Sequence, residues 1–302
     1  MKIINFGSCN IDHVYSLQHI VSPGETVSAE GLTEHSGGKG LNQSIAAAVA
    51  GGDVYHIGNI GKDGLFLKDL LDKSGVNTRL LNVDDERTGH AIIQLDESGE
   101  NCIIVCQGAN GLITEKQIDN TVNSFCAGDI CMLQNEIPKT DYIINAAHKK
   151  GMTVIWNPSP FNDKINRESI SLCDYVILNS TEGKELAGLD GADEILKQLT
   201  ADYPNTGFVL TLGSKGSIFG RGESRINQEA FRAKPVDTTG AGDTFAGYFA
   251  AALSKGYEIK VAMTYASAAA AIATEALGAA NSIPPLEKVQ ERIKNQKKLI
   301  FC

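Results

Sequence analysis

The sequence lacks several features by which protein classes are recognised. None of its seven cysteines forms a C-x-x-C pair, and its six histidines show no H-x-x-x-H spacing. This pattern is typical of reduced thiols in a cytosolic protein and indicates neither a redox motif nor a zinc motif. Apolar runs such as Ala266–Ala273 are too short to cross a bilayer. The first residues, Met1–Gly7, lack the apolar segment of a signal peptide, so we expect a cytoplasmic protein with no membrane contact.

Positive charge is also scarce. The chain has 27 Lys and Arg residues against 36 Asp and Glu residues, a formal net charge of −9, which argues against nucleic-acid binding. The first strand is followed by Gly7–Asn10 instead of G-x-G-x-x-G, so a dinucleotide-dependent oxidoreductase fits badly. The segment Gly37–Asn42 has neither the spacing nor the Ser or Thr of a Walker A loop. An anionic substrate must therefore be held by helix ends, a lysine or a bound cation.

The 302 residues do contain a regular alternation of short apolar runs and helical patterns. The predicted strands are Ile3–Cys9, Val54–Ile60, Ile130–Gln134, Thr153–Asn157, Tyr175–Asn179 and Phe208–Leu212. The predicted helices are Gly40–Ala50, Gly64–Ser74, Thr140–Lys150 and Ala192–Ala201, followed by helices at about 240–255, 258–276 and 286–297. Continuous apolar strands separated by amphipathic helices indicate a parallel sheet covered on both faces. We predict a single α/β domain over residues 1–302 with a three-layer α/β/α core.

Two segments break this alternation. Glu25–His35 has extended, mixed character, and Gly89–Val105 is a hairpin whose turn is Asp96–Gly99. We expect a small β lid, built from about 12–36 and 88–108, inserted in the domain. Such a sheet can close over a ligand and exclude water. Its exposed edges and apolar face favour pairing with a second subunit.

The most informative segment is Asp237–Asp243, which runs directly into the helical pattern Thr244–Leu253. Backbone N–H groups at a helix N-terminus attract anions, and Gly240 and Gly242 allow a ligand to approach the backbone closely. An aspartate beside a bound phosphate is repelled, unless it takes a proton from an attacking hydroxyl. The segment therefore indicates phosphoryl transfer to an alcohol, although taken alone it is equally typical of a well-capped helix.

Further polar motifs stand where strands are predicted to end. They are Asn10–Asp12, Gly37–Asn42, Asn179–Glu182 and Thr211–Gly213. Ligands of open parallel sheets gather at the carboxyl ends of the strands, so these motifs predict one shared site. Taken singly, each has an ordinary alternative: Asn179 as a helix N-cap, for example, and Asn10 as a turn residue.

Seven ordered motifs carry a resemblance to a known family. They are Asn10–His13, Ser22–Val27, Gly37–Gln43, Gly108–Asn110, Asn179–Glu182, Thr211–Gly216 and Asp237–Asp243. In these motifs the chain resembles the ribokinase (PfkB-type) family of sugar kinases along its whole length. The resemblance implies a central, mainly parallel sheet flanked by helices, with a small β lid that often forms the contact of a homodimer.

The family's site residues transfer to matching positions of this chain. Asp243 resembles the general base, with the backbone of Gly240, Ala241, Gly242 and Asp243 as an anion hole for the γ-phosphate. The sugar-binding positions are Asn10, Asp12, Gly38, Lys39, Asn42, Glu136 and Asp243. The positions for ATP and its Mg²⁺ are Asn179, Glu182, Thr211 and Gly213. A monovalent cation, usually K⁺, is expected at Asp237, Thr239, Ala273, Ala276, Gly278 and Ser282. The family often has a basic residue at the position of Ala276, which leaves a carbonyl ligand intact here.

The resemblance implies ATP-dependent phosphorylation of the 5-hydroxyl of D-ribose to ribose 5-phosphate. Deoxyribose and nucleosides remain alternative substrates. A sugar-phosphate kinase should bring additional basic residues to the sugar, whereas Lys39 is the only one in the matched sugar motifs. A non-catalytic sugar sensor is a further alternative, which the intact Asp243 and its glycine turn disfavour.

Overall fold

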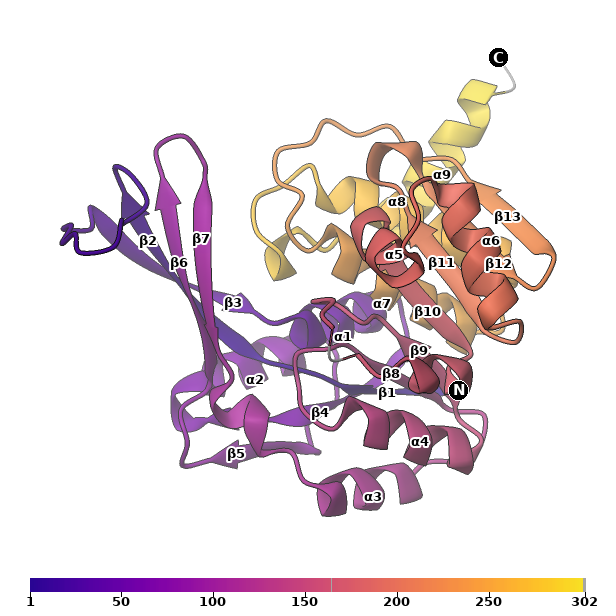
Figure 1. Ribbon diagram of the computed structural model, residues 1–302, viewed down its shortest axis with the longest axis horizontal. Helices are drawn as coiled ribbons and strands as arrows, with labels where there is room; N and C mark the ends of the chain where they lie inside the picture. The colour runs from indigo at the N-terminus through magenta and orange to yellow at the C-terminus, as the bar shows by residue number, and fades with distance from the viewer. Residues whose placement is uncertain (164, 301–302) are drawn as a thin grey trace.

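The computed structural model describes residues 1–163 and 165–300, so Cys302 lies outside the described residues. Within that range the larger of two sheets has nine strands (Figure 1). Their spatial order is β13 (Ser224–Gln228), β12 (Ser217–Arg221), β11 (Gly207–Thr211), β10 (Tyr175–Asn179), β9 (Thr153–Trp156), β8 (Ile130–Leu133), β1 (Lys2–Phe6), β4 (Asp53–Gly61) and β5 (Leu81–Asp84). The strands from β11 to β5 in this order are parallel, and β12 and β13 are antiparallel to their neighbours.

Helices cover both faces of the central sheet (Figure 1). One face carries α1 (Lys39–Val49), α2 (Leu65–Lys73), α7 (Ala241–Ser254), α8 (Ile259–Ala273) and α9 (Leu286–Ile300). The other face carries α3 (Glu115–Asn123), α4 (Thr140–Lys150), α5 (Ser180–Ala187) and α6 (Ala192–Asp202). Short 3₁₀ turns lie at η1 (Lys62–Gly64), η2 (Gly108–Leu112), η3 (Arg167–Leu172), η4 (Gly213–Lys215) and η5 (Ala280–Ser282). The predicted three-layer α/β/α fold is confirmed.

The parallel strands are apolar throughout because their alternate side chains enter two different cores. Ile3 of β1 packs with the α1, α7 and α8 helices, whereas the next residue, Ile4, packs with α3 and α4. In β11, Val209 joins the first core and Phe208 the second. Full burial of such a side chain stabilises the fold by about 1.5–3 kcal/mol. A strand with two buried faces therefore reads as a continuous apolar run.

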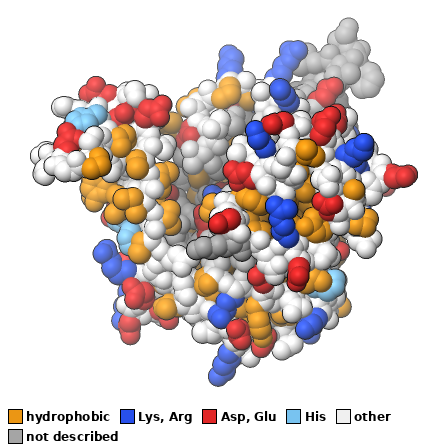
Figure 2. All heavy atoms as spheres, viewed as in Figure 1, with side chains coloured by type: hydrophobic (Ala, Val, Ile, Leu, Met, Phe, Trp, Pro, Cys, Tyr) orange, Lys and Arg blue, Asp and Glu red, His pale blue; other side chains and the backbone are white. Residues whose placement is uncertain are grey.

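The smaller sheet stands apart from the body of the molecule (Figure 1). Its strands lie in the order β3 (Gly31–Gly37), β2 (Asn10–Leu17), β6 (Gly89–Asp96) and β7 (Asn101–Cys106), with a parallel pair, β2 and β6, in the middle. Asp96 closes the predicted hairpin turn, since its Oδ1 accepts hydrogen bonds from the backbone N–H groups of Ser98 and Glu100. Hydrophobic side chains gather on this projecting sheet (Figure 2).

The expected element boundaries were wrong in several places. β1 ends at Phe6 rather than Cys9, because the chain leaves the central sheet there and enters the smaller one at Asn10. Only residues 31–37 of the extended segment around Glu25–His35 form a strand. The sequence patterns missed β5, β12, β13, α3 and α5. These elements are short or amphipathic, so they lack the apolar runs that marked the central strands.

In the described part of the chain, no helix combines the length and the hydrophobicity needed to span a membrane.

Candidate functional site

The candidate site lies where the carboxyl ends of the parallel strands meet the N-terminus of α7. Gly240 caps this helix in a left-handed conformation, with φ 72°. A Cβ at Gly240 would lie 2.8 Å from the Cβ of Ala279, so both the backbone angle and the space require glycine. At Gly242 a Cβ would meet open space. The first turn of α7 is therefore open on one side, and its third residue is Asp243.

Asp243 is a buried carboxylate, with 9% of the residue exposed. Its Oδ2 accepts a hydrogen bond of 3.0 Å from Asn42 Nδ2, and its Oδ1 accepts one of 2.9 Å from Gln43 Nε2. Burial raises the pKa of Asp243 to about 6, against the opposing effects of the Lys39 charge and these two hydrogen bonds. The nearby Glu136 raises this pKa further. Asp243 is thus a stronger base than an ordinary aspartate and is still mainly ionised at neutral pH.

Lys39 and Glu136 form an ion pair beside Asp243. Lys39 Nζ lies 3.6 Å from Glu136 Oε1, and Glu136 Oε2 accepts hydrogen bonds from the Lys39 N–H and from Ser8 Oγ. Burial would lower the pKa of Lys39, but Glu136, Asp243 and Glu182 together raise it. Lys39 is therefore a fixed positive charge among carboxylates.

The remaining predicted sugar-binding residues surround this pair. Burial, together with Glu136, raises the pKa of Asp12 to about 6, while Lys39 opposes this shift. Asn10 is held through its Oδ1, which accepts a hydrogen bond of 2.7 Å from Asn110 Nδ2. Gly38 has φ 96°, and a Cβ there would lie 3.1 Å from the Asn10 nitrogen. The structure thus brings the predicted sugar residues together from β2, α1 and the loop after β8.

A cavity of about 150 Å³ opens at this point. Its lining includes residues predicted for the sugar, the anion hole and the nucleotide, namely Lys39, Asn179, Glu182, Thr211, Gly240, Gly242 and Asp243. The other lining residues are Asn157, Ser159, Ile177 and Leu178. Asn42 borders the same place, because it is hydrogen-bonded to Asp243, and its own Oδ1 is buried without a partner among the described residues. An unpaired buried acceptor is destabilising, so a ligand that donates a hydrogen bond to Asn42 Oδ1 would gain binding free energy.

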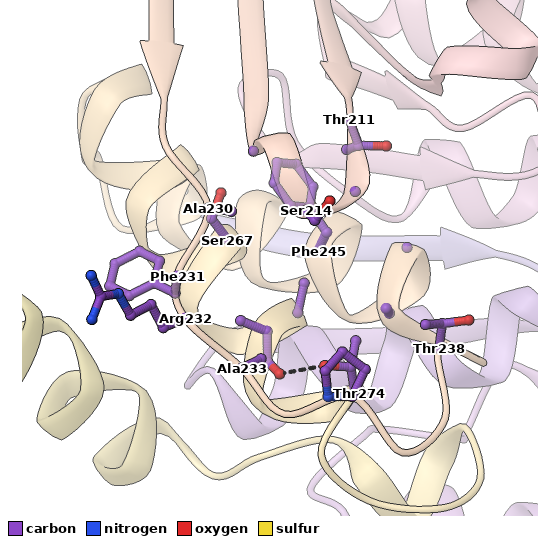
Figure 3. A pocket seen from close by; sticks show the side chains of 17 residues that line it. Thr211, Ser214, Ala230, Phe231, Arg232, Ala233, Thr238, Phe245, Ser267 and Thr274 are labelled. Carbon is purple, nitrogen blue, oxygen red and sulfur yellow. Dashed lines mark hydrogen bonds between the residues drawn. The ribbon is translucent and has the colours of Figure 1, made fainter.

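A second, larger hollow of about 650 Å³ lies on the other side of the α7 N-terminus. Figure 3 shows the labelled side chains around it, from the end of β11, the segment 230–235, α7 and α8. Its lining residues are Thr211, Gly213, Ser214, Gly216, Ala230, Phe231, Arg232, Ala233, Pro235, Thr238, Ala241, Gly242, Phe245, Ser267, Ala270, Ala271 and Thr274. Thr211 and Gly242 border both hollows, so the two meet at the glycine turn.

Asn179 and Glu182 form a reciprocal cap at the start of α5. Asn179 Oδ1 accepts a hydrogen bond from the Glu182 N–H, and Glu182 Oε2 accepts one from the Asn179 N–H, both at 2.9 Å. The N-cap interpretation of Asn179 is therefore right. The two residues also line the 150 Å³ cavity, so the cap holds a carboxylate at the site.

The residues expected at the monovalent cation site lie on two loops that contact each other. Asp237 Oδ1 accepts hydrogen bonds from Thr239 N and Oγ1, and its Oδ2 accepts one of 2.9 Å from Gly278 N. Ala273, Ala276 and Ser282 follow along the chain from the end of α8. No cluster of three or more His, Cys, Asp or Glu side chains suited to a metal occurs within residues 1–163 and 165–300. The predicted set instead combines the single carboxylate of Asp237 with carbonyl and hydroxyl oxygens of its other members.

Sequence reasoning assigned no role to several residues of the site. Gln43 and Asn110 stand inside recognised motifs, and Gln134 and Asn157 end two of the predicted strands. A polar residue at the carboxyl end of a buried strand was the available signal for the last two. The wall formed by residues 230–235 carried no signal, because this segment belongs to no predicted strand or helix.

Comparisons with known proteins identify the family. Residues 1–286 match the pfkB family carbohydrate kinase. The ribokinase of Haemophilus influenzae is 36% identical over 299 residues, which cover 96% of this chain and 97% of that protein. The deoxyribokinase of Salmonella typhi is 29% identical over 96% of this chain and 98% of its own. The structure of Arabidopsis thaliana ribokinase complexed with ribose and ATP has a TM-score of 0.87 and 30% identity, covering 97% of this chain and 98% of that chain.

Proposed function

The chain belongs to the pfkB family of carbohydrate kinases, and we propose that it transfers the γ-phosphoryl group of ATP to the 5-hydroxyl of D-ribose. The products are ADP and ribose 5-phosphate. The position of Asp243 carries this proposal: a buried carboxylate at a helix N-terminus, where a small charged cavity meets a larger hollow. The relatives named ribokinase, and the ribose and ATP of the Arabidopsis complex, support the choice of substrates.

In this proposal Asp243 accepts the proton of the sugar's 5-hydroxyl as the oxygen attacks the γ-phosphorus. A pKa of about 6 leaves the carboxylate ionised at neutral pH and keeps it basic enough to help. Hydrogen bonds from Asn42 and Gln43 fix its position. General-base assistance of this kind is worth about 10²- to 10⁴-fold in rate.

The glycine turn supplies the anion hole. The first helical hydrogen bond of α7 runs from Thr244 N–H to the Gly240 carbonyl, so the N–H groups of Gly242 and Asp243 precede it and point out of the helix end. The Ala241 N–H already lies 3.3 Å from the Thr238 carbonyl. Gly242 and Asp243 are therefore the main donors to the transferring phosphoryl group, and one such donor is typically worth about 2.7–4 kcal/mol.

The ATP is assigned to the larger hollow, with Thr211 and Gly213 along its phosphates. Asn179 and Glu182 would hold Mg²⁺, in part through water, and the ion would neutralise charge on the phosphates. The Glu182 cap uses Oε2, which leaves Oε1 for this task. A K⁺ ion would be held by Asp237 and by oxygens of Thr239, Ala273, Ala276, Gly278 and Ser282. Its charge would favour an anion beside the glycine turn.

The decisive experiment is an assay of ADP release over pentoses, hexoses, sugar phosphates and nucleosides, run with K⁺ and with Na⁺. We expect the highest kcat/KM with D-ribose, a lower value with 2-deoxyribose, and more stimulation by K⁺ than by Na⁺. A strong preference for a phosphorylated hexose would overturn the substrate while leaving the family unaffected.

We also propose that a second copy of the chain covers the outer strand of the small sheet, which then serves as both lid and dimer contact. All residues of β7 are exposed, including Ile103 at 51%, Ile104 at 57% and Val105 at 63%. Exposed apolar edges of this kind favour association. Light scattering should give a dimer for the native chain and a monomer for Ile104→Lys. A cytoplasmic location stays a prediction.

A further inference from the structure

A chain of buried side-chain hydrogen bonds leads from Asp243 into the interior, away from both hollows. Gln43 Nε2 donates to Asp243 Oδ1 at 2.9 Å. Behind it, Gln134 Nε2 donates to Gln43 Oε1 at 2.8 Å and to Asn5 Oδ1 at 2.9 Å. Asn5 Nδ2 in turn donates to Ser44 Oγ at 2.8 Å. Three amides from α1, β1 and the end of β8 thus connect the carboxylate to the centre of the fold.

The polarity of this chain is determined by the carboxylate. An ionised Asp243 only accepts hydrogen bonds, so Gln43 must present its NH₂ group to it. The Gln43 oxygen then faces Gln134, which must present its own NH₂ group. That group lies between the oxygens of Gln43 and Asn5. If the Gln134 amide turned over, its oxygen would face two other acceptors, and the Gln43 amide would lose the contact that fixes its orientation.

The three amide side chains of this hydrogen-bonded series are buried, and their arrangement lowers the stability of the fold. Gln134 Oε1 has no partner among the described residues, and burying an unpaired polar atom costs about 1–3 kcal/mol. The space beside it is also tightly packed, since a Cβ at Gly7 would lie 2.4 Å from the Gly40 Cα and 2.7 Å from Gln134 Oε1. Apolar side chains would fill this position without an unpaired atom. A polar chain that ends on the reacting carboxylate therefore suggests a catalytic benefit.

We propose that Gln134 is a positioning residue for phosphoryl transfer, acting through Gln43 on the orientation and ionisation of the Asp243 carboxylate. This inference rests on the proposed function. A second contact supports Gln43 in the same role, because its Nε2 also donates to Asn157 Oδ1 at 2.9 Å, and Asn157 Nδ2 donates to the Ile177 carbonyl. Gln43 thus uses both of its donor hydrogens and its acceptor.

The charges around Asp243 determine the sign of the expected pH effect. Lys39 lowers the pKa of Asp243 and Glu136 raises it, while Asp12 and Glu182 face this ion pair. His56, whose Nδ1 lies 2.8 Å from Ser44 Oγ, is neutral in the working range because burial lowers its pKa to about 4. The Gln43 hydrogen bond also lowers the pKa of Asp243. Losing its orientation should therefore move the acidic limb of the kcat profile to higher pH.

The test compares Gln134→Met with the native enzyme in ADP release at saturating ribose and ATP. We expect kcat to fall about 10- to 100-fold, as a small misplacement of a catalytic group does. Both KM values should stay within about threefold, since Gln134 lines neither hollow. The acidic limb should move upward by about half a pH unit or more.

Two further variants keep the test decisive if Gln134→Met folds poorly. Ser44→Ala removes the hydroxyl to which Asn5 donates, at the inner end of the hydrogen-bonded chain. The position lies within α1, where alanine is the best helix former, so this variant should fold. Its acidic limb should move in the same direction as that of Gln134→Met, by a smaller amount. Thr206→Val is the matched control, because it removes an equally buried hydrogen bond, to the Ile170 carbonyl, far from the site. This control should lower the melting temperature without moving the kcat profile.

Each outcome decides the proposal. A folded Gln134→Met enzyme with native kcat and an unmoved acidic limb would overturn it, as would a Ser44→Ala profile identical to that of Thr206→Val. Asp243→Asn separates this failure from failure of the proposed function. If that variant keeps its turnover, Asp243 is not the base. If Asp243→Asn loses turnover while Gln134→Met and Ser44→Ala keep the native kcat profile, only the positioning role of Gln134 is wrong.

Discussion

The two hollows that meet at the α7 N-terminus are built from different kinds of residue. The smaller one holds the Lys39–Glu136 pair at its edge and the buried carboxylates Glu182 and Asp243 in its wall. The larger one is walled mainly by small or apolar side chains from the segment 230–235 and α8. Catalysis requires charges and dipoles that are already in position, whereas binding of a nucleoside depends mainly on an apolar cavity of complementary shape. The difference supports the proposal that the chemistry takes place in the first hollow and that the nucleotide binds in the second.

The largest expected effect is on the charged side. Asp243→Asn should lower kcat by about 10²- to 10⁴-fold, because asparagine cannot accept the sugar's proton. Ribose binding, measured by calorimetry, should persist. Asp129→Asn is the matched control, since Asp129 is also 9% exposed but lies near the opposite end of the sheet, where it accepts a hydrogen bond from Lys2 N. Near-native turnover in Asp243→Asn would contradict the proposal that the smaller hollow holds the catalytic base.

A steric change should separate the nucleotide side from the sugar side. Ala270 lines the larger hollow from α8, so Ala270→Phe should raise the KM for ATP by about 10-fold or more, equivalent to about 1.4 kcal/mol of binding. The KM for ribose should change little. Val261→Phe places the same ring on an exposed position of α8 and serves as the control. An equal rise in both KM values would show that the hollows do not act independently.

The pH dependence of kcat and of the KM for ribose tests which carboxylate of the site titrates in each. The pKa of Asp243 is about 6, and only its ionised form accepts a proton, so kcat should fall towards tenfold per pH unit below about pH 6. Asp12 has a similar pKa, but it belongs to the sugar-binding set, so its protonation should appear in the KM for ribose. Measuring kcat at saturating ribose isolates Asp243. The acidic limb of the kcat profile should persist in Asp12→Asn. It should be absent from the residual activity of Asp243→Asn, and this pair of results would assign the limb to Asp243.

The smallest effect concerns stability. Folding raises the pKa of Asp243 from its ordinary 3.8 to about 6, so the folded protein holds this proton more tightly. Stability therefore declines as pH rises through that window, and the full cost remains above about pH 6. Asp243→Asn avoids this cost and should melt higher at pH 7.5, by about 2–4 °C per kcal/mol regained. At pH 4 the difference should shrink, and a lower melting temperature at pH 7.5 would contradict the argument.

The sequence predicted the charged hollow better than the apolar one. Asp243, Lys39 and Glu182 stand in short motifs, whose glycines and acids are rare in combination. The wall at 230–235 has no such pattern, and α8 reads as an ordinary buried helix rich in alanine. Shape depends on how distant segments are packed, and periodicity carries no information about that.

The sequence by itself determined the layered α/β fold, because continuous apolar strands and amphipathic helices have few other ways to bury their surfaces. It also determined the glycine turn before α7, because the left-handed backbone at Gly240 requires a residue without a Cβ. Only the tertiary structure decided which side chains meet Asp243. Gln43 and Gln134 are 91 residues apart, and their contact exists because α1 packs against the sheet beside the carboxyl end of β8. The raised pKa of Asp243 has the same origin, since burial and neighbouring charges arise only when these elements are assembled.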